Sequence, residues 1–164
     1  MYLRNCWYVA GWSKDFDRVL KAEKFLNENI VIYRKKDGSP AALENACPHR
    51  KLPLSKGTLA DDNIICAYHG LTFNSEGQCT DSPTQRGMTP RRAVVKSYPV
   101  VDRYRLLWIW MGDPKLANPE TIFPIENFDN PNWGCTDGGV LDIKCNYLWV
   151  CDNLLDPSHV AWVH

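Results

Sequence analysis

Two short clusters of soft metal ligands stand out in this chain. Cys47 is followed by His49, and Cys66 is followed by His69, so each cluster offers one thiolate and one imidazole. Two kinds of metal centre use such a set: a tetrahedral zinc ion, and a 2Fe-2S cluster that takes two Cys on one iron and two His on the other. Zinc fingers usually place two thiolates in the first half of the site. The mixed halves therefore favour the iron-sulfur cluster, with structural zinc as the alternative.

The residues around the two clusters carry a family resemblance. The pattern C-x-H followed by C-x-x-H, with Tyr directly before the second His and Gly70 after it, resembles the Rieske domains of ring-hydroxylating and demethylating oxygenases. The resemblance implies that Cys47 and Cys66 bind one iron of the cluster. It also implies that His49 and His69 bind the other iron.

The same resemblance bears on the reduction potential. Respiratory-chain members of the family carry an extra Cys in each loop and join the two by a disulfide, whereas Leu52 and Tyr68 stand at those positions here. A cluster without that disulfide, and with fewer hydrogen bonds to its sulfurs, is expected toward the low end of the roughly −150 to +300 mV Rieske range. The sequence thus predicts a centre that receives electrons from a reductase.

A second set of ligand-type residues lies near the end of the chain. Asn153, Asp156 and His159 are three apart and share one face if the segment is helical. His159 and His164 would lie about 140° apart on a regular helix, so one metal takes both only if the helix is distorted. Pro157 supplies a reason for a bulge or a helix end, because it lacks a backbone donor and disfavours helix in the residue before it. Taken alone, a polar helix face is the simpler interpretation.

The pattern D-x-x-H-x-x-x-x-H after a Rieske motif resembles Rieske non-haem iron oxygenases of the vanillate O-demethylase, toluenesulfonate methyl-monooxygenase and dicamba demethylase type. The resemblance implies that His159 and His164 bind a mononuclear Fe(II), with Asn153 as a further catalytic candidate. It implies that Asp156 accepts hydrogen bonds from a cluster His and from His159 across a subunit boundary in a head-to-tail homotrimer. The third, carboxylate ligand and most of the substrate pocket are expected beyond His164, so the chain is expected to be a fragment.

This resemblance implies an activity. The chain would be the oxygenase component of a monooxygenase that uses O2 and electrons from NAD(P)H, delivered by a separate flavin and iron-sulfur reductase. Its substrate would be a small aromatic compound, which it hydroxylates or O-demethylates. The alternative is a Rieske ferredoxin-like electron carrier without its own catalysis, favoured by length alone.

Composition narrows the class of protein. Nineteen basic and nineteen acidic residues balance without a basic block, which argues against a nucleic-acid partner. The first six residues lack the basic start and apolar run of a signal peptide, so none is expected, and the longest strongly apolar run, residues 106–111, is far shorter than the roughly twenty residues of a membrane helix. A cytoplasmic protein is expected. An odd count of seven Cys without a signal predicts reduced thiols, and those outside the clusters are expected to be small buried hydrophobes: Cys6, Cys79, Cys135, Cys145 and Cys151.

The elements around the ligands predict a mainly β Rieske domain of antiparallel sheets, with both cluster-binding loops at hairpin tips. Strands are expected at residues 5–10, 25–34, 41–43, 64–66, 71–73, 78–80, 96–101 and 104–110, with tight turns at 37–38 and 102–103. Residues 82–92 are expected to form a surface loop. The domains are predicted as 1–117 for the Rieske domain, 118–139 for a linker, and 140–164 for the helical start of an α+β catalytic domain.

Overall fold

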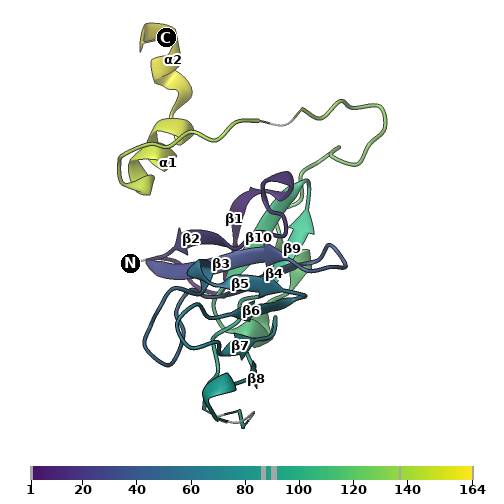
Figure 1. Ribbon diagram of the computed structural model, residues 1–164. Coiled ribbons are helices and arrows are strands. Elements are labelled where there is room, and N and C mark those ends of the chain that lie inside the picture. Colours follow the sequence, from purple (N-terminus) through teal and green to yellow (C-terminus); the bar gives the residue numbers. More distant parts are fainter. Residues whose placement is uncertain (1, 86–87, 90–91, 137, 164) are drawn as a thin grey trace. The chain divides into compact units, whose positions relative to one another are not determined.

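The computed structural model describes residues 2–85, 88–89, 92–136 and 138–163 (Figure 1). The chain divides into two compact units, unit 1 (Met1–Glu126) and unit 2 (Asn127–His164). The division falls inside the predicted linker. Its first part belongs to unit 1, because Ile122 is buried and the Trp7 indole donates to the backbone oxygen of Asn118.

Unit 1 is built from three antiparallel sheets, as expected for the fold class. The first has the order β1-β10-β9, the second β2-β3-β4 and the third β5-β6-β7-β8. The strands are β1 (Cys6–Trp12), β2 (Lys21–Phe25), β3 (Glu28–Arg34), β4 (Pro40–Glu44), β5 (Thr58–Ala60), β6 (Asn63–Ile65), β7 (Thr72–Phe73), β8 (Cys79–Asp81), β9 (Val100–Arg103) and β10 (Leu106–Met111). Short 3-10 turns lie at Ser13–Asp15, Leu54–Lys56, Pro83–Gln85, Pro114–Leu116 and Pro119–Thr121.

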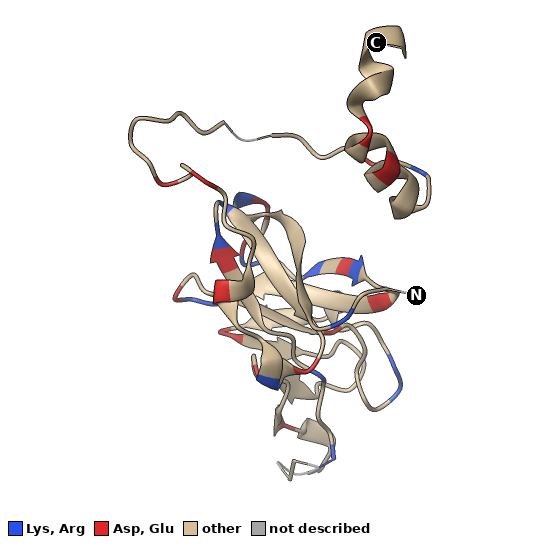
Figure 2. Ribbon diagram, turned by 180° about the vertical axis from the view of Figure 1, so that it is seen from behind, with Lys and Arg blue, Asp and Glu red and all other residues tan. Residues whose placement is uncertain are grey.

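Strand β3 separates two hydrophobic cores, since side chains on a strand alternate between its faces. Val31 and Tyr33 pack into the core that also holds both candidate cysteine ligands. Ile30 and Ile32 pack into the other core, against Leu107 and its neighbours on β10. All four β3 residues are fully buried, so the middle sheet is apolar on both faces. Charged residues lie mainly on loops and strand ends in Figure 2.

Two hairpins differ from the sequence expectation. Residues 25–34 are not one strand: β2 ends at Phe25, and Leu26 and Asn27 form a two-residue turn into β3. The β9–β10 turn consists of Tyr104 and Arg105, two residues later than predicted. All four turn residues have positive φ, the geometry of a type I′ turn, which is usually marked by Gly. Strand β5 was also not predicted.

Unit 2 contains α1 (Tyr147–Leu155), a 3-10 turn at Pro157–His159 and α2 (Val160–Val163). Helix α1 begins after Asn146, whose side chain accepts from the backbone N–H of Leu148. It ends at Asp156, whose backbone leaves the helical region directly before Pro157. The predicted distortion is therefore a helix break on the N-terminal side of His159. Among the described helices, none is long and apolar enough to cross a lipid bilayer.

None of the seven cysteines, all of which lie in the described residues, forms a disulfide. The expectation that the five outside the ligand set are buried is wrong, since Cys145 and Cys151 are exposed and Cys6, Cys79 and Cys135 are half-buried. Cys151 is exposed because it lies on α1, of which no described residue is buried.

Candidate metal centre

The two ligand loops share one backbone pattern. In the first, the N–H of Cys47 donates to the carbonyl of Leu52, and the N–H of Lys51 donates back to the carbonyl of Cys47, both at 2.8 Å. In the second, Cys66 and Leu71 make the equivalent bond at 2.9 Å, and Gly70 and Cys66 the other at 3.0 Å. The fifth residue of each loop is in the left-handed region, with φ of 57° at Lys51 and 71° at Gly70. Each Cys is thus held at the start of a closed, equivalent turn.

The loops differ in what they connect. The second joins the antiparallel strands β6 and β7, so its predicted place at a hairpin tip is confirmed. The first runs from β4 in one sheet to β5 in another, so the prediction of a hairpin tip is wrong for it. Buried Asn45 closes this longer loop instead: its side chain accepts from the backbone N–H of Ser55 and donates to the Ser55 hydroxyl.

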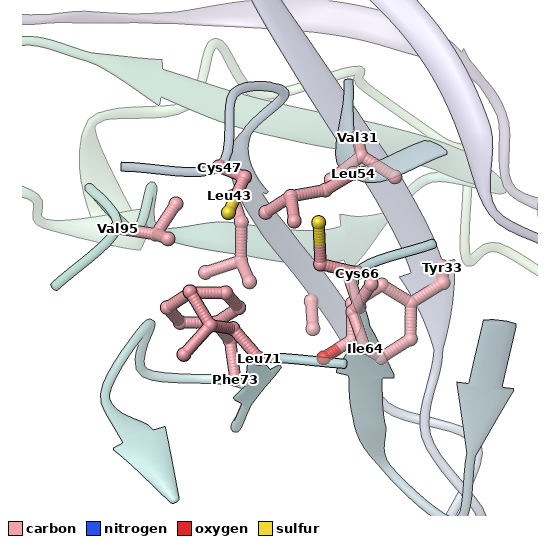
Figure 3. Close-up of a cluster of buried hydrophobic side chains, with 11 residues drawn as sticks. Val31, Tyr33, Leu43, Cys47, Leu54, Ile64, Cys66, Leu71, Phe73 and Val95 are labelled. Atoms are coloured by element: carbon pink, nitrogen blue, oxygen red, sulfur yellow. The ribbon is translucent and has the colours of Figure 1, made fainter. Parts of the chain in front are cut away.

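Both cysteine side chains point into the apolar core (Figure 3). Cys47 is 2 % exposed and Cys66 is 3 % exposed. Burial raises the pKa of the Cys47 thiol, hydrogen bonds from the backbone N–H groups of His49 and Arg50 oppose that rise, and the adjacent Cys66 adds to it. Two neighbouring buried thiols with backbone donors aimed at one sulfur suit thiolates that are neutralised by a bound cation.

The two imidazoles lie toward solvent and face each other. His49 is exposed and His69 is half-buried. Their Nδ1 atoms are 3.1 Å apart, and the ring centroids are 4.6 Å apart. Two nitrogens at that separation fit two ligands of one metal ion. With metal–imidazole bonds of about 2.0–2.1 Å, the value for zinc, the angle between the two bonds at the ion is roughly a right angle. The Tyr68 ring stacks on His69, with centroids 3.9 Å apart.

The four residues therefore sort into an inner thiol pair and an outer imidazole pair, each loop supplying one of each. In the part of the chain that the structure describes, no three or more His, Cys, Asp or Glu side chains gather at one point, as a single zinc ion would need. Two separate pairs fit a cluster with two irons, one per pair. The geometry thus favours the iron-sulfur alternative over zinc.

A cavity of about 300 Å³ lies beside the imidazole pair. It is lined by Pro48, His49, His69, Leu71, Ser82, Thr84, Arg92 and Ala93. Ser82 is 1 % exposed, although the sequence predicted a surface loop from it onward. The remainder of that loop lies partly outside the described residues. The Asp81 carboxylate accepts the Ser82 N–H at 2.8 Å, so the backbone donor of this buried residue is satisfied.

The C-terminal candidate ligands lie around the helix break in unit 2. The His159 Nδ1 is 2.6 Å from the backbone oxygen of Asp156, and its Nε2 is 3.3 Å from the side-chain nitrogen of Asn153. Asn153, Asp156 and His159 are thus brought together. The Asp156 carboxylate accepts from the backbone N–H of Ser158, and hydrogen bonds from Ser158 lower the pKa of that carboxyl. His164 lies outside the described residues.

The comparisons with known proteins agree with the loop geometry. Residues 6–99 match the family model for the Rieske 2Fe-2S domain. The chain belongs to the Rieske family. Residues 143–164 of this Rieske protein match a second model, the vanillate O-demethylase oxygenase C-terminal domain.

Relatives of the Rieske chain are oxygenase components. A toluene-4-sulfonate monooxygenase system iron-sulfur subunit of Comamonas testosteroni is 46% identical over 100% of this chain and 47% of its own length. A dicamba O-demethylase oxygenase component of Stenotrophomonas maltophilia is 40% identical over 99% of this chain and 48% of its own length. A crystal structure of dicamba monooxygenase bound to dicamba superposes with a TM-score of 0.92 at 40% identity, over 99% of this chain and 48% of that one. The chain spans about half the length of these relatives.

Two features of the Rieske site were missed at the level of sequence. Asn45 precedes the first ligand loop by two residues, where an Asn is common in any turn and gives no specific signal. The burial of Ser82 had no signal either, since Ser followed by Pro usually marks an exposed turn. Both depend on contacts with residues distant in sequence.

Proposed function

We propose that this chain is the electron-accepting and iron-binding part of the oxygenase component of a Rieske-type monooxygenase. The observation that carries the proposal is the sorting of four ligands into a buried thiol pair and an outward imidazole pair with Nδ1 atoms 3.1 Å apart. The same ligand arrangement would serve a pure electron carrier; the match of residues 143–164 to the vanillate O-demethylase oxygenase C-terminal domain is what favours the oxygenase component.

In unit 1, Cys47 and Cys66 would hold the inner iron of a 2Fe-2S cluster, and His49 and His69 the outer iron. A bound cluster supplies one-electron storage. The apolar core around the cysteines excludes water from the sulfurs, and the N–H groups of His49 and Arg50 stabilise charge on the Cys47 sulfur. The exposed ring of His49 leaves the outer side open to an electron donor.

In unit 2, His159 and His164 would hold an Fe(II) with a carboxylate supplied from elsewhere. When bound by two His and one carboxylate, such an ion would supply the chemistry of O2 activation. The contact between His159 Nδ1 and the Asp156 backbone oxygen favours the tautomer with the proton on Nδ1, which leaves the lone pair of Nε2 as the one that a metal would use in place of its present contact with Asn153. Asn153, next to that Nε2, would lie beside the bound ion.

The partners follow from this assignment. The electron donor would be an NAD(P)H-dependent flavin and iron-sulfur reductase, and NAD(P)H as reductant fits a cytoplasmic protein. The substrate would be a small aromatic compound that is hydroxylated or loses a methyl group from oxygen. Asp156 would couple the two metal sites between neighbouring subunits of a homotrimer. Relatives named as toluenesulfonate monooxygenase and dicamba and vanillate O-demethylase components support this substrate class.

The test separates electron transfer from oxygenation. Protein produced from the natural gene is reduced with NAD(P)H and a reductase of this class, under O2, with a methoxybenzoate as substrate. Formaldehyde release that depends on the reductase, and that is lost in both His69→Ala and His159→Ala, is the expected result. Cluster reduction with no oxygenated product from any of a panel of methoxy-, methyl- and sulfo-substituted aromatics would contradict the oxygenase proposal and leave a carrier.

A further inference from the structure

The Ser82 hydroxyl is buried without a hydrogen-bond partner. Its Oγ is the buried side-chain oxygen or nitrogen atom for which the described residues provide neither donor nor acceptor. Burying a hydroxyl is unfavourable unless it bonds to something, so an orphaned one in a native fold calls for a specific partner. A partner is therefore sought among the groups next to Ser82.

Ser82 lies at the edge of the cavity beside the imidazole pair, with its hydroxyl turned away from solvent. Ser82 lines it together with His49, His69 and Leu71. Among the described residues that line the cavity, Ser82 is the one that is both polar and buried. A hydroxyl rotates to suit an acceptor and needs no further rearrangement.

The backbone holds Ser82 firmly against the second ligand loop. Its N–H is bonded to Asp81, the last residue of β8. The next residue, Pro83, lies so close to Gly70 that a Cβ on Gly70 would be 3.1 Å from the Pro83 Cγ. The Ser82–Pro83 segment therefore packs directly beside the loop that carries Cys66 and His69.

We propose that the Ser82 hydroxyl donates a hydrogen bond to a sulfur of the cluster held by the two ligand loops and thereby raises its reduction potential. The inference rests on the cluster assignment made above. Sulfur in a cluster becomes more negative on one-electron reduction, so a neutral donor stabilises the reduced state more than the oxidised state. Ser82 is then a residue that tunes the potential and binds neither substrate nor iron.

The experiment compares the reduction potentials of the complete chain and of Ser82 variants, each checked for iron and acid-labile sulfide. Ser82→Ala removes the donor and should lower the reduction potential of the cluster. For a one-electron couple, a tenfold change in the ratio of reduced to oxidised cluster corresponds to about 59 mV. Ser82→Thr keeps the hydroxyl and should stay near the natural value. Thr84→Ala is the matched control, because Thr84 lines the same cavity but is exposed.

The outcomes separate this inference from the cluster assignment. An unchanged potential in a fully loaded Ser82→Ala variant would overturn the hydrogen bond while leaving the cluster in place. Where Ser82→Ala does not load, Ser82→Cys provides a weaker donor of similar size, and a potential equal to the natural one would overturn the proposal in the same way. Natural protein without acid-labile sulfide would overturn the cluster assignment and this inference with it.

Discussion

The shared backbone of the two ligand loops leads to a pair of substitutions with opposite effects. Gly70 has φ of 71°, and a Cβ there would meet Pro83 at 3.1 Å. A left-handed backbone costs a residue with a Cβ about 1–2 kcal/mol, so Gly70→Ala should destabilise the chain by about that amount or slightly more. Lys51 already carries the equivalent cost, with φ of 57°. Lys51→Gly should therefore recover about 1–2 kcal/mol, offset by the roughly 0.5–1 kcal/mol that glycine loses in backbone entropy.

The assay is urea unfolding under anaerobic conditions, followed by tryptophan fluorescence and by the visible absorption of the bound cluster. Gly70→Ala should shift the midpoint down and shed the cluster earlier, whereas Lys51→Gly should leave the midpoint unchanged or raise it. Lys51→Ala is the control, because it removes the exposed 3.8 Å ion pair with Glu44 but keeps a Cβ in the left-handed region. That pair is worth little in water, so the control should stay within about 0.5 kcal/mol of the natural chain. Equal losses in Gly70→Ala and Lys51→Gly would refute the reasoning.

Three further predictions concern other parts of the chain. Burial opposes ionisation of Glu28, but hydrogen bonds from Lys96, Tyr98 and Arg4 outweigh it and lower its pKa from 4.5 to about 2. Because the folded pKa lies below the unfolded one, the stabilisation from the Glu28 carboxylate is present above about pH 4.5 and is lost as the pH falls toward 2. Glu28→Gln should therefore lower the free energy of unfolding by about 1–2 kcal/mol at pH 7 after solvent screening. A difference in unfolding free energy between the natural chain and this variant that does not narrow below pH 4.5 would contradict the prediction. Asn45→Ala leaves the Ser55 N–H of the first ligand loop without its acceptor, so about 1–3 kcal/mol of unfolding free energy and part of the bound iron should be lost. Ser55→Ala removes only one of the two hydrogen bonds between these residues and should lower the unfolding free energy by less. Asp156→Asn should retain both metals and slow reoxidation of the cluster in a single turnover, and an unchanged rate would rule out the proposed bridge.

The candidate ligand residues could be proposed from sequence because each ligand loop is local. Cys47 with His49, and Cys66 with His69, lie within four residues, and the turn that holds each pair is closed by bonds inside the same loop. The hairpin around the second loop was predictable for the same reason. The run of consecutive apolar residues at 30–33 in β3 likewise indicated a strand buried on both faces.

The misses arise where position depends on distant contacts or unusual backbone. Leu26, Asn27, Tyr104 and Arg105 occupy positive φ without Gly, so neither turn carried its usual signal. The first ligand loop spans two sheets and is closed by Asn45, which local spacing does not reveal. Ser82 is buried in a segment whose next residue, Pro83, lies against Gly70 of the second ligand loop, a neighbourhood that local sequence does not reveal.

The central claim is that the two loops hold a cluster with two Cys on its inner iron and two His on its outer iron. The most direct measurement is iron and acid-labile sulfide per purified chain, combined with the nitrogen couplings of the reduced centre after ¹⁵N labelling of histidine. The account predicts about two sulfides per chain and couplings to two histidine nitrogens, one of which disappears in His49→Cys. A colourless chain that contains zinc and no sulfide, or a centre without histidine couplings, would contradict it.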